Sequence, residues 1–261
     1  MSRVVGIIPC HLASVRFPRK ILFPFAGLAM VEHVRRRALM AEGLDEVIVA
    51  TCDDEIEAAV KAGGGRVVRT ANTHTNGTSR IAEAVKGVDC DHVILLQGDE
   101  PLLLPSHVEA LIEGIHAHPK ADVWNVTGPI EAEDELDRHS FVKCSVAPDN
   151  RILYCFRRSP SAAAFEVQQQ YIRKILGLFA FRRDALIEIA AEAPSPVEQA
   201  ESIEQMRLIE YGRMLVSVPV GISLPSVNEP HEADIVLDKI SHDPVQKALL
   251  ERVLAGGTNR G

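Results

Sequence analysis

The sequence predicts an α/β fold with a mostly parallel, doubly wound sheet and an antiparallel excursion in the second half of the chain. Up to residue 100, short β-branched runs alternate with stretches of helical periodicity, which is typical of parallel strand–helix–strand units. Between residues 141 and 156, two strand-like runs are joined only by a turn, which predicts a hairpin. A chain of 261 residues can bury a sizeable core, and we expect a single domain over residues 1–261.

The alternating elements of the first half are placed by their apolar patterns. We expect strands at residues 4–8, 47–50 and 66–69 and immediately before Gln97, and helices at residues 30–41, between Asp54 and Gly63, from Ile81 onward and at residues 108–115. Asp54 with Glu57, and Ser106 with Glu109, match the capping-box pattern at two of the helix starts. The triple glycine at residues 63–65 is interpreted as a helix-to-strand turn.

The second half mixes further helices with the antiparallel excursion. We expect strands at residues 121–127, 141–147, 152–156, 175–181 and 214–218, and a loop at residues 159–170. Ser195, Pro196 and Glu198 form the N-cap, first-turn proline and box partner of a helix that we expect to reach Gly212. A terminal helical region follows residue 228, and residues 256–261 are expected to fray.

Composition and charge argue against several kinds of partner. The formal net charge of −8 disfavours nucleic acid and membrane surfaces, and an aromatic content of 5% leaves few rings on which single-stranded bases stack. The five cysteines are odd in number and lack CxxC spacing, so we expect free thiols in a reducing compartment. No apolar run has the length of a membrane span, and we expect a cytoplasmic protein.

The first candidate site follows the strand that ends before Gln97. Here an apolar run passes into Gln-Gly-Asp-Glu-Pro, a polar and turn-prone cluster. Ligands bind at the carboxyl ends of strands in an open parallel sheet, and Mg²⁺ takes carboxylate oxygens such as those of Asp99 and Glu100 together with phosphate oxygens. A surface loop with two solvated acids explains this stretch equally well, so the residues alone leave both interpretations open.

Two other polar segments follow predicted strands. Residues 10–20 contain the donors and cations His11, Ser14, Arg16, Arg19 and Lys20. Such a set can wrap a polyanion such as a triphosphate, and a solvated basic loop is the alternative. Residues 70–80 are polar and lead into a helix whose N-terminus is suited to a base, ribose or phosphate.

Taken in order, these stretches resemble the 3-deoxy-manno-octulosonate cytidylyltransferases, and the resemblance spans most of the chain. The Gln-Gly-Asp-Glu-Pro core of that family is intact at residues 97–101 and is the most specific match. Other family motifs are similar to residues 9–20, 74–80, 156–160, 177–182 and 201–207.

The resemblance implies a nucleotidyltransferase sheet in one domain and a transfer of CMP from CTP to the anomeric hydroxyl of a 3-deoxy-manno-octulosonate-like sugar acid, with release of pyrophosphate. The implied cofactor is Mg²⁺, with Asp99 and Asn228 as its ligands, and Lys20 and Asp99 are the implied catalytic residues. The implied nucleotide-binding residues are Pro9, Cys10, His11, Ser14, Arg16, Lys20, His74, Asn76, Gly77, Thr78, Arg80, Gln97, Gly98 and Asp99. The implied contacts to the sugar acid are Gln97, Arg158, Phe181, Glu204 and Gln205.

The first loop and the implied metal site depart from the family pattern. His11 replaces an Arg, Arg19 replaces a Gly, and Asn228 replaces a metal-binding Asp. An amide oxygen carries no charge, so metal affinity is expected to fall, and Glu229 is an alternative ligand. Cys10 lies beside the nucleotide loop, where we expect a small buried side chain and not a nucleophile.

The implied sugar-acid site departs from the pattern too. Ile175, Phe179 and Phe181 replace a His and two tyrosines. A site that loses polar partners generally accepts a less hydroxylated ligand, so a related sugar acid, a nonulosonic acid or a phosphonate is an alternative acceptor. A nucleotide-binding protein without catalysis is a third interpretation, disfavoured by the retained Asp99 and Lys20. The resemblance also implies a homodimer, joined through an antiparallel subregion at residues 136–182.

Overall fold

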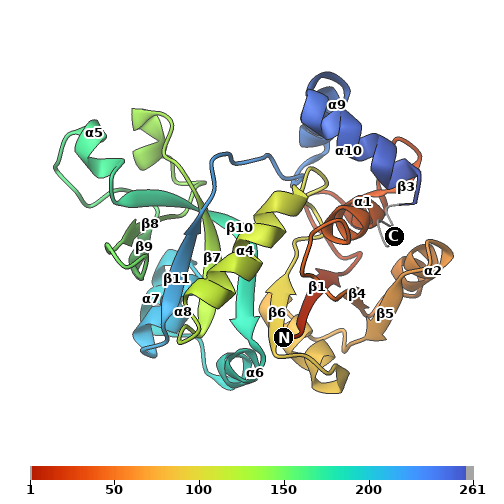
Figure 1. Cartoon of the computed structure of the whole chain (residues 1–261), viewed down its shortest axis with the longest axis horizontal. Coiled ribbons are helices and arrows are strands. Elements are labelled where there is room, and N and C mark those ends of the chain that lie inside the picture. The colour runs from red at the N-terminus through yellow and green to blue at the C-terminus, as the bar shows by residue number, and fades with distance from the viewer. Residues whose placement is uncertain (1, 257–261) are drawn as a thin grey trace. The chain divides into compact units, whose positions relative to one another are not determined.

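The computed structural model describes residues 2–256, and contacts within the chain group it into two compact units (Figure 1). The first unit runs to Ile112 and resumes at Leu224, and the second covers Glu113–Ser223. The strand pairs in the main sheet of the first unit are parallel, whereas the second unit contains antiparallel pairs. The predicted fold class is therefore confirmed, and the predicted subregion at residues 136–182 lies in the second unit.

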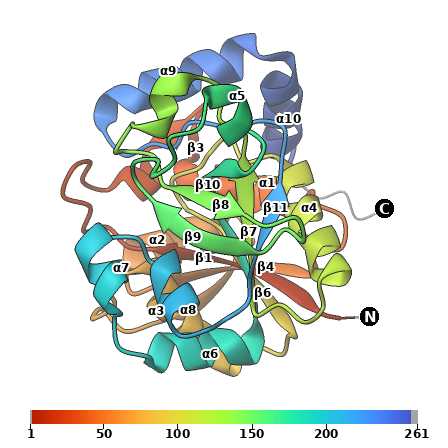
Figure 2. The ribbon, with the colours of Figure 1, turned by 90° about the vertical axis from the view of Figure 1, so that its left-hand side faces the viewer.

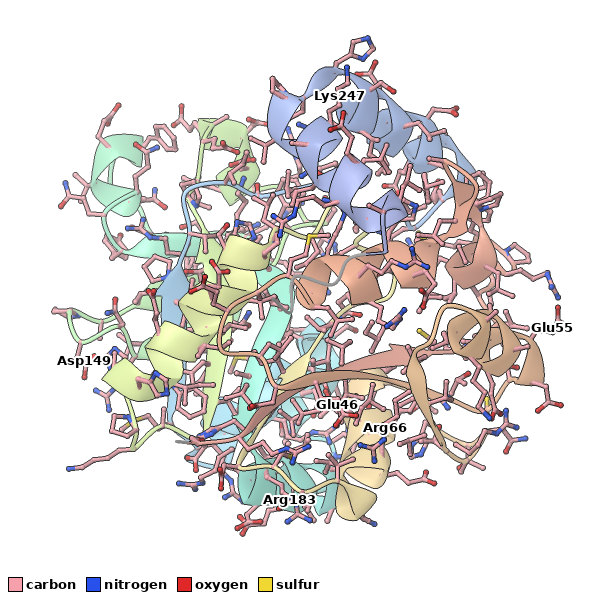
Figure 3. The ribbon with its side chains drawn as sticks, turned by 45° about the vertical axis from the view of Figure 1, so that its right-hand side comes forward. Glu46, Glu55, Arg66, Asp149, Arg183 and Lys247 are labelled. Atoms are coloured by element: carbon pink, nitrogen blue, oxygen red, sulfur yellow. The ribbon has the colours of Figure 1, made fainter. Side chains whose placement is uncertain are left out.

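The sheet of the first unit has the strand order β6–β1–β4–β5. Its members are β1 (Val4–Cys10), β4 (Glu46–Thr51), β5 (Arg66–Arg69) and β6 (His92–Leu95). The valines and isoleucines of β1 are at most 1% exposed, because both faces of this central strand are covered. At the start of β4 and β5, Glu46 and Arg66 form an ion pair of 2.9 Å (Figure 3).

Helices α1 (Met30–Ala38), α2 (Asp54–Ala62) and α3 (Gly77–Ala84) pack on this sheet, as the alternating pattern predicts. The terminal helices α9 (Pro230–His242) and α10 (Pro244–Leu254) pack against each other, and α10 also packs on α1. Helix α4 (Pro105–Ala117) begins in this unit. Short 3₁₀ turns, η1 (Lys20–Leu22) and η2 (Val85–Gly87), and a two-stranded ribbon, β2 (Pro24–Phe25) with β3 (Leu28–Ala29), were not predicted. The glycines at 63–65 form the predicted turn between α2 and β5.

Both capping boxes predicted in the first half are wrong. α2 begins at Asp54, so Asp53 occupies the cap position, and its carboxylate accepts a hydrogen bond from the backbone N–H of Leu12 at 2.9 Å instead. α4 begins at Pro105, so Ser106 already lies inside the helix. Proline suits the first helical position because the N–H that it lacks would have no partner within the helix.

The second unit contains the predicted hairpin (Figure 2). Its strands are β7 (Val123–Gly128), β8 (Lys143–Val146), β9 (Ile152–Phe156), β10 (Ile172–Arg182) and β11 (Leu215–Pro219). β7 pairs with β11 in parallel and with β10 antiparallel, and β8 pairs antiparallel with both β10 and β9. The turn between β8 and β9 holds Asn150 in the left-handed region, with φ of 64°, which asparagine tolerates.

Two expectations for the second unit are corrected. Its helical segments are η3 (Glu133–Leu136), α5 (Phe165–Gln168), α6 (Arg183–Ala191), α7 (Pro196–Glu201) and α8 (Gln205–Glu210), so the loop predicted at residues 159–170 contains a short helix. The capping box of Ser195 and Glu198 is confirmed, but the helix breaks at Ser202, where φ is 54°. The Arg157 guanidinium donates to the carbonyls of Glu201 and Ser202 at this break.

Two further expectations concern the chain as a whole. Among residues 2–256, no helix has the length and apolar character needed to cross a membrane. The five cysteines are free, as predicted. The frayed tail predicted after Gly256 lies outside the described residues.

Candidate nucleotide site

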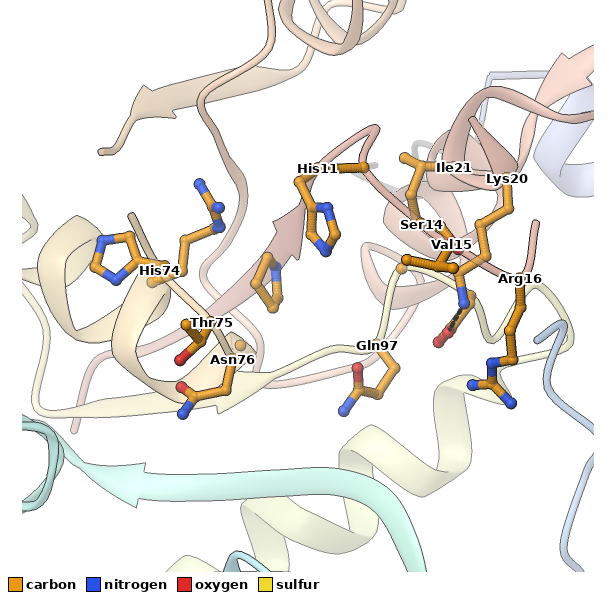
Figure 4. Close-up of a pocket in the computed structure, with 16 residues that line it drawn as sticks. His11, Ser14, Val15, Arg16, Lys20, Ile21, His74, Thr75, Asn76 and Gln97 are labelled. Carbon is orange, nitrogen blue, oxygen red and sulfur yellow. Dashed lines mark hydrogen bonds and ion pairs between the residues drawn. The ribbon is translucent and has the colours of Figure 1, made fainter. Parts of the chain in front are cut away.

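A cavity of about 340 Å³ in the first unit is lined by the segments that follow β1, precede α3 and follow β6. This volume is within the range of small-ligand sites. Figure 4 shows Arg16 and Lys20 at one end, His74 and Asn76 at the other, and His11 between them. The lining residues are Pro9, His11, Ala13, Ser14, Val15, Arg16, Lys20, Ile21, His74, Thr75, Asn76, Gly77, Arg80, Gln97, Gly98 and Asp99.

The structure thus brings the three predicted segments together, with two exceptions among the predicted residues. Cys10 and Thr78 do not line the cavity, and their exposed fractions are 1% and 6%. Burial raises the pKa of the Cys10 thiol far above its ordinary value, in keeping with the expected inert side chain. Sequence reasoning missed Ala13, Val15, Ile21 and Thr75. The only signal for three of them was their place inside the two loops, and Ile21 directly follows the first loop.

One end of the cavity is organised around the Asp99 carboxylate. The Lys20 Nζ lies 2.5 Å from Asp99 Oδ2 and 3.1 Å from the carbonyl oxygen of Val227. The backbone N–H of Val227 in turn donates to the carbonyl oxygen of Asp99 at 2.8 Å. The sequence pattern contained no signal for Val227, because its partners lie more than a hundred residues away.

Asn228 lies next to this group. Its Oδ1 accepts a hydrogen bond from Arg16 at 3.3 Å, and its backbone N–H donates to Glu232. Glu229, the alternative metal ligand, is exposed and occupies the N-cap of α9. The Asp99 carboxylate, the Val227 carbonyl and the Asn228 amide each carry an oxygen, which is the ligand atom that Mg²⁺ prefers.

The other end of the cavity is held by side chains of α3. Asn76 caps this helix by accepting a hydrogen bond from the backbone N–H of Ser79 at 2.8 Å. His74 contacts the Ser79 hydroxyl through Nδ1 at 3.1 Å and the Glu83 carboxylate through Nε2. Arg80 donates to Thr70 Oγ1 at 2.6 Å. These contacts set the orientation of the imidazole at the cavity wall.

Two glycines allow the backbone itself to line the cavity. A Cβ at Gly98 would lie 3.0 Å from Ile21 Cδ1 and 3.1 Å from Cys10 Sγ, and one at Gly77 would lie 3.0 Å from Pro9 Cγ. Any larger residue would have to displace these neighbours. Close packing around the main chain therefore favours glycine at both positions.

The charges in and beside the cavity are shaped by burial. Burial, together with the positive charges of Arg80 and Lys20, lowers the pKa of His11, so its imidazole is neutral at pH 7. Burial and the neighbouring Asp99 raise the pKa of Glu100 to about 8. Glu100 is not among the lining residues, so Asp99 alone of the two predicted carboxylates faces the cavity.

The other predicted sugar-acid residues lie in the second unit. Arg158 follows β9 and is exposed, Phe181 is buried in β10 and stacks on Phe179 with 6.1 Å between ring centroids, and Glu204 is half-buried. Gln205 is 7% exposed, and its Nε2 donates to Asn125 Oδ1 at 3.3 Å. Contact of these residues with an acid stays a prediction.

Comparison with known proteins assigns the chain to a family. A sequence profile of the cytidylyltransferases matches residues 5–216. The 3-deoxy-manno-octulosonate cytidylyltransferase of Escherichia coli is 38% identical over 230 residues, which is 88% of this chain and 93% of that protein. The chain belongs to the 3-deoxy-manno-octulosonate cytidylyltransferase family. The member from Geobacter metallireducens is 35% identical over 250 residues, 92% of this chain and 98% of that protein.

Solved structures agree with membership of the 3-deoxy-manno-octulosonate cytidylyltransferase family. CMP:2-keto-3-deoxy-manno-octonic acid synthetase, solved in complex with CTP, matches with a TM-score of 0.87 at 36% identity over 93% of this chain and 100% of that one. A cytidylyltransferase from Leptospira borgpetersenii matches with a TM-score of 0.65 at 15% identity, over 100% of this chain and 99% of that one, which shows a shared fold alone. The predicted family is confirmed.

Proposed function

We propose that this cytidylyltransferase transfers CMP from CTP to 3-deoxy-manno-octulosonate or a closely related sugar acid. The anomeric hydroxyl oxygen of the acid forms a bond to the α-phosphorus, the bond from that phosphorus to the bridging oxygen breaks, and pyrophosphate leaves with the electron pair while the hydroxyl loses its proton. The observation that carries this proposal is the cavity in which Lys20, Arg80 and Asp99 meet the backbone of Gly77 and Gly98, in a chain of this family.

The two ends of the cavity suit the two ends of a nucleotide. Lys20 and Arg16 would neutralise the triphosphate, because charge-assisted hydrogen bonds to phosphate are the strongest that side chains make. The segment from His74 to Gly77, at the N-terminus of α3, would bind cytosine and ribose. Catalysis would consist mainly of positioning and of electrostatic stabilisation.

Mg²⁺ is the proposed cofactor. Asp99 would hold it through a carboxylate oxygen and Asn228 through an amide oxygen, with phosphate oxygens completing the shell. No group of three or more His, Cys, Asp or Glu side chains suited to a metal occurs in the part of the chain that the structure describes, so the nucleotide would have to supply ligands. Bound Mg²⁺ would stabilise the negative charge that develops on the α-phosphate in the transition state.

Arg158, with Gln97, Glu204 and Gln205, is proposed to contact the acid. A guanidinium can bind a carboxylate through two parallel hydrogen bonds, and Arg158 is exposed whereas the neighbouring Arg157 is engaged with backbone carbonyls. Phe179 and Phe181 form an apolar stack, which offers no hydrogen bonds to hydroxyl groups. A less hydroxylated acid, a nonulosonic acid or a phosphonate is therefore the second candidate acceptor.

We further propose a cytoplasmic homodimer. Leu153 and Tyr154 on the β8–β9 hairpin are 48% and 41% exposed, and apolar side chains at a strand surface favour association. Free thiols on all five cysteines suit a reducing compartment. Sedimentation velocity of the intact chain and of a variant with Leu153→Lys and Tyr154→Lys tests the dimer, which this variant should dissociate.

The deciding experiment measures pyrophosphate release with Mg²⁺, each of the four nucleoside triphosphates and a panel of acids that includes 3-deoxy-manno-octulosonate, nonulosonic acids and phosphonates. We expect turnover with CTP and with the octulosonate, and loss of turnover in Asp99→Asn or after chelation of the metal. Best turnover with another acid would favour the second candidate. Tight CTP binding without turnover on any acid would overturn the proposed activity.

A further inference from the structure

In the structure, the Lys20 ammonium lies where a cation bound to Asp99 would be expected. It contacts two oxygens, Asp99 Oδ2 at 2.5 Å and the carbonyl oxygen of Val227 at 3.1 Å. A carboxylate oxygen with a carbonyl oxygen is the donor set that a hard divalent cation takes. The protein's own cation thus fills a position whose oxygens suit a metal.

These two oxygens belong to segments that are joined directly. The N–H of Val227 donates to the carbonyl oxygen of Asp99 at 2.8 Å, so the backbones of the two segments are linked independently of Lys20. The side chains of Lys20 and Asp99 are only 14% and 22% exposed, so solvent screens their attraction less than at an open surface. A divalent cation arriving at Asp99 would meet a positive charge in close contact with the same carboxylate.

We propose that Lys20 holds the place of the divalent cation at Asp99 until a nucleotide binds. The triphosphate draws the ammonium to its own oxygens, which frees the Asp99 carboxylate for the metal. The inference rests on the proposed function, in which Asp99 is a metal ligand. It gives Lys20 two opposite effects, because Lys20 opposes metal binding in the free protein and permits it in the complex.

Coupling of this kind is reciprocal. If CTP removes a competitor from Asp99, CTP tightens metal binding, and the metal tightens CTP binding by the same factor. Removal of the ammonium should abolish the part of this coupling that Lys20 carries. Without the Lys20 ammonium, the Asp99 carboxylate should be accessible to the metal before any nucleotide binds.

The test measures Mn²⁺ binding to the whole chain without nucleotide, from the electron paramagnetic resonance signal of unbound Mn²⁺. We expect Lys20→Met to bind Mn²⁺ about tenfold more tightly than the unaltered protein, and Lys20→Arg, which retains the charge, to remain weak. Lys61→Met is the matched control, because Lys61 is 62% exposed on α2 and pairs with Glu57. It should leave Mn²⁺ binding unchanged.

Two further samples separate this inference from the proposed metal role of Asp99. Lys20→Met combined with Asp99→Asn should lose the gain in Mn²⁺ affinity, and Asp99→Asn alone should weaken Mn²⁺ binding in the presence of CTP. Unchanged affinity in Lys20→Met, with the Asp99→Asn effect intact, overturns the place-holder role alone. Unchanged binding in Asp99→Asn with CTP overturns the metal assignment itself. Thermal unfolding of each variant verifies that it is folded.

Discussion

The two loops that line the cavity are held in different ways. Residues 70–76 are held by the helix that directly follows them, α3. Arg80 donates to Thr70 and to the carbonyl of Ala71, and Glu83 accepts from the backbone N–H of Ala71 and contacts His74. Every one of these partners lies within a few turns of the loop in sequence, so loop and helix form one local structure.

The loop at residues 10–20 is held by distant parts of the chain. Asp53 accepts from the Leu12 backbone N–H, and Glu55 pairs with Arg19. Lys20 and Arg16 reach Val227 and Asn228. Arg19 also adopts a left-handed conformation, with φ of 61°, which costs a non-glycine residue free energy.

The two loops are therefore expected to respond differently to a ligand. A loop that closes on its own helix loses little chain entropy when it forms, so the wall near His74 is set before any ligand arrives. The first loop depends on contacts of its cations with Asp99, Val227 and Asn228, and a polyanion competes for the same cations. We expect it to change partners on binding, and the following experiments test that difference.

The largest effect is expected at Lys20. Its replacement by Met should lower kcat by about 10²–10³-fold, the loss seen when one charge-stabilising donor is removed from an active site. Pyrophosphate release at saturating CTP measures it, and Lys20→Arg should recover part of the rate. If kcat of Lys20→Met falls by less than about tenfold, the first loop does not stabilise the transition state.

The next effect concerns the stability of the second loop. Arg80→Met leaves Thr70 Oγ1 and the carbonyl of Ala71 without their charged donor and should lower the free energy of unfolding by about 2–3 kcal/mol. Urea unfolding measures the loss of stability. The control is Arg69→Met, because the Arg69 side chain is 46% exposed and pairs with Asp54 and Glu57. Equal losses in the two variants would mean that α3 does not hold this loop.

Glu83 tests the orientation of His74. Glu83→Gln weakens the contact to the imidazole and should raise KM for CTP about fivefold, the equivalent of about 1 kcal/mol, with kcat unchanged. Steady-state kinetics measure KM and kcat, and Glu57→Gln on α2, which pairs with Lys61 and does not line the cavity, is the control. A fall in kcat at unchanged KM would place His74 in the chemical step and not in nucleotide binding.

His11 tests whether the first loop responds to charge. Its pKa is lowered by burial and then by Arg80 and Lys20, so it is neutral at pH 7 in the free protein. A bound triphosphate favours the imidazolium, so CTP binding takes up a proton and tightens a few-fold as pH falls from 7 to 5.5. Calorimetric titration compares the unaltered protein with His11→Asn, which should lack this part of the pH dependence. If the pH dependence of CTP binding is identical in the two proteins, His11 does not take up the proton.

The smallest effect is expected at Arg19. Its pair with Glu55 is more than half exposed on both sides, and such pairs contribute about 0–1 kcal/mol. Arg19→Gly loses the pair but removes the left-handed strain, so the free energy of unfolding should change by less than about 1 kcal/mol. Urea unfolding measures it beside Glu55→Gln, which keeps the strain and should be the less stable of the two. Because both variants lose the ion pair, the reverse order would show that the left-handed conformation of Arg19 costs no such free energy.

Features with local causes were predictable. The alternation of apolar runs and helical patterns defined the α/β class, the turn at Asn150 defined the hairpin, and the box at Ser195 defined a helix start. The run of residues 97–101 marked the carboxyl end of β6 as a site. Each depends on residues within a few positions of one another, where spacing alone decides which side chains meet.

The sequence by itself therefore determined the fold class, the family and the three segments that line the cavity. Only the tertiary structure decided that Lys20 bridges Asp99 and Val227, that Asp53 binds the first loop and does not cap its helix, that Cys10 and Thr78 are buried, and that a helix breaks at Ser202. The physical reason is distance along the chain. Contacts between remote residues arise from packing of the whole unit, and no local pattern of residues encodes them.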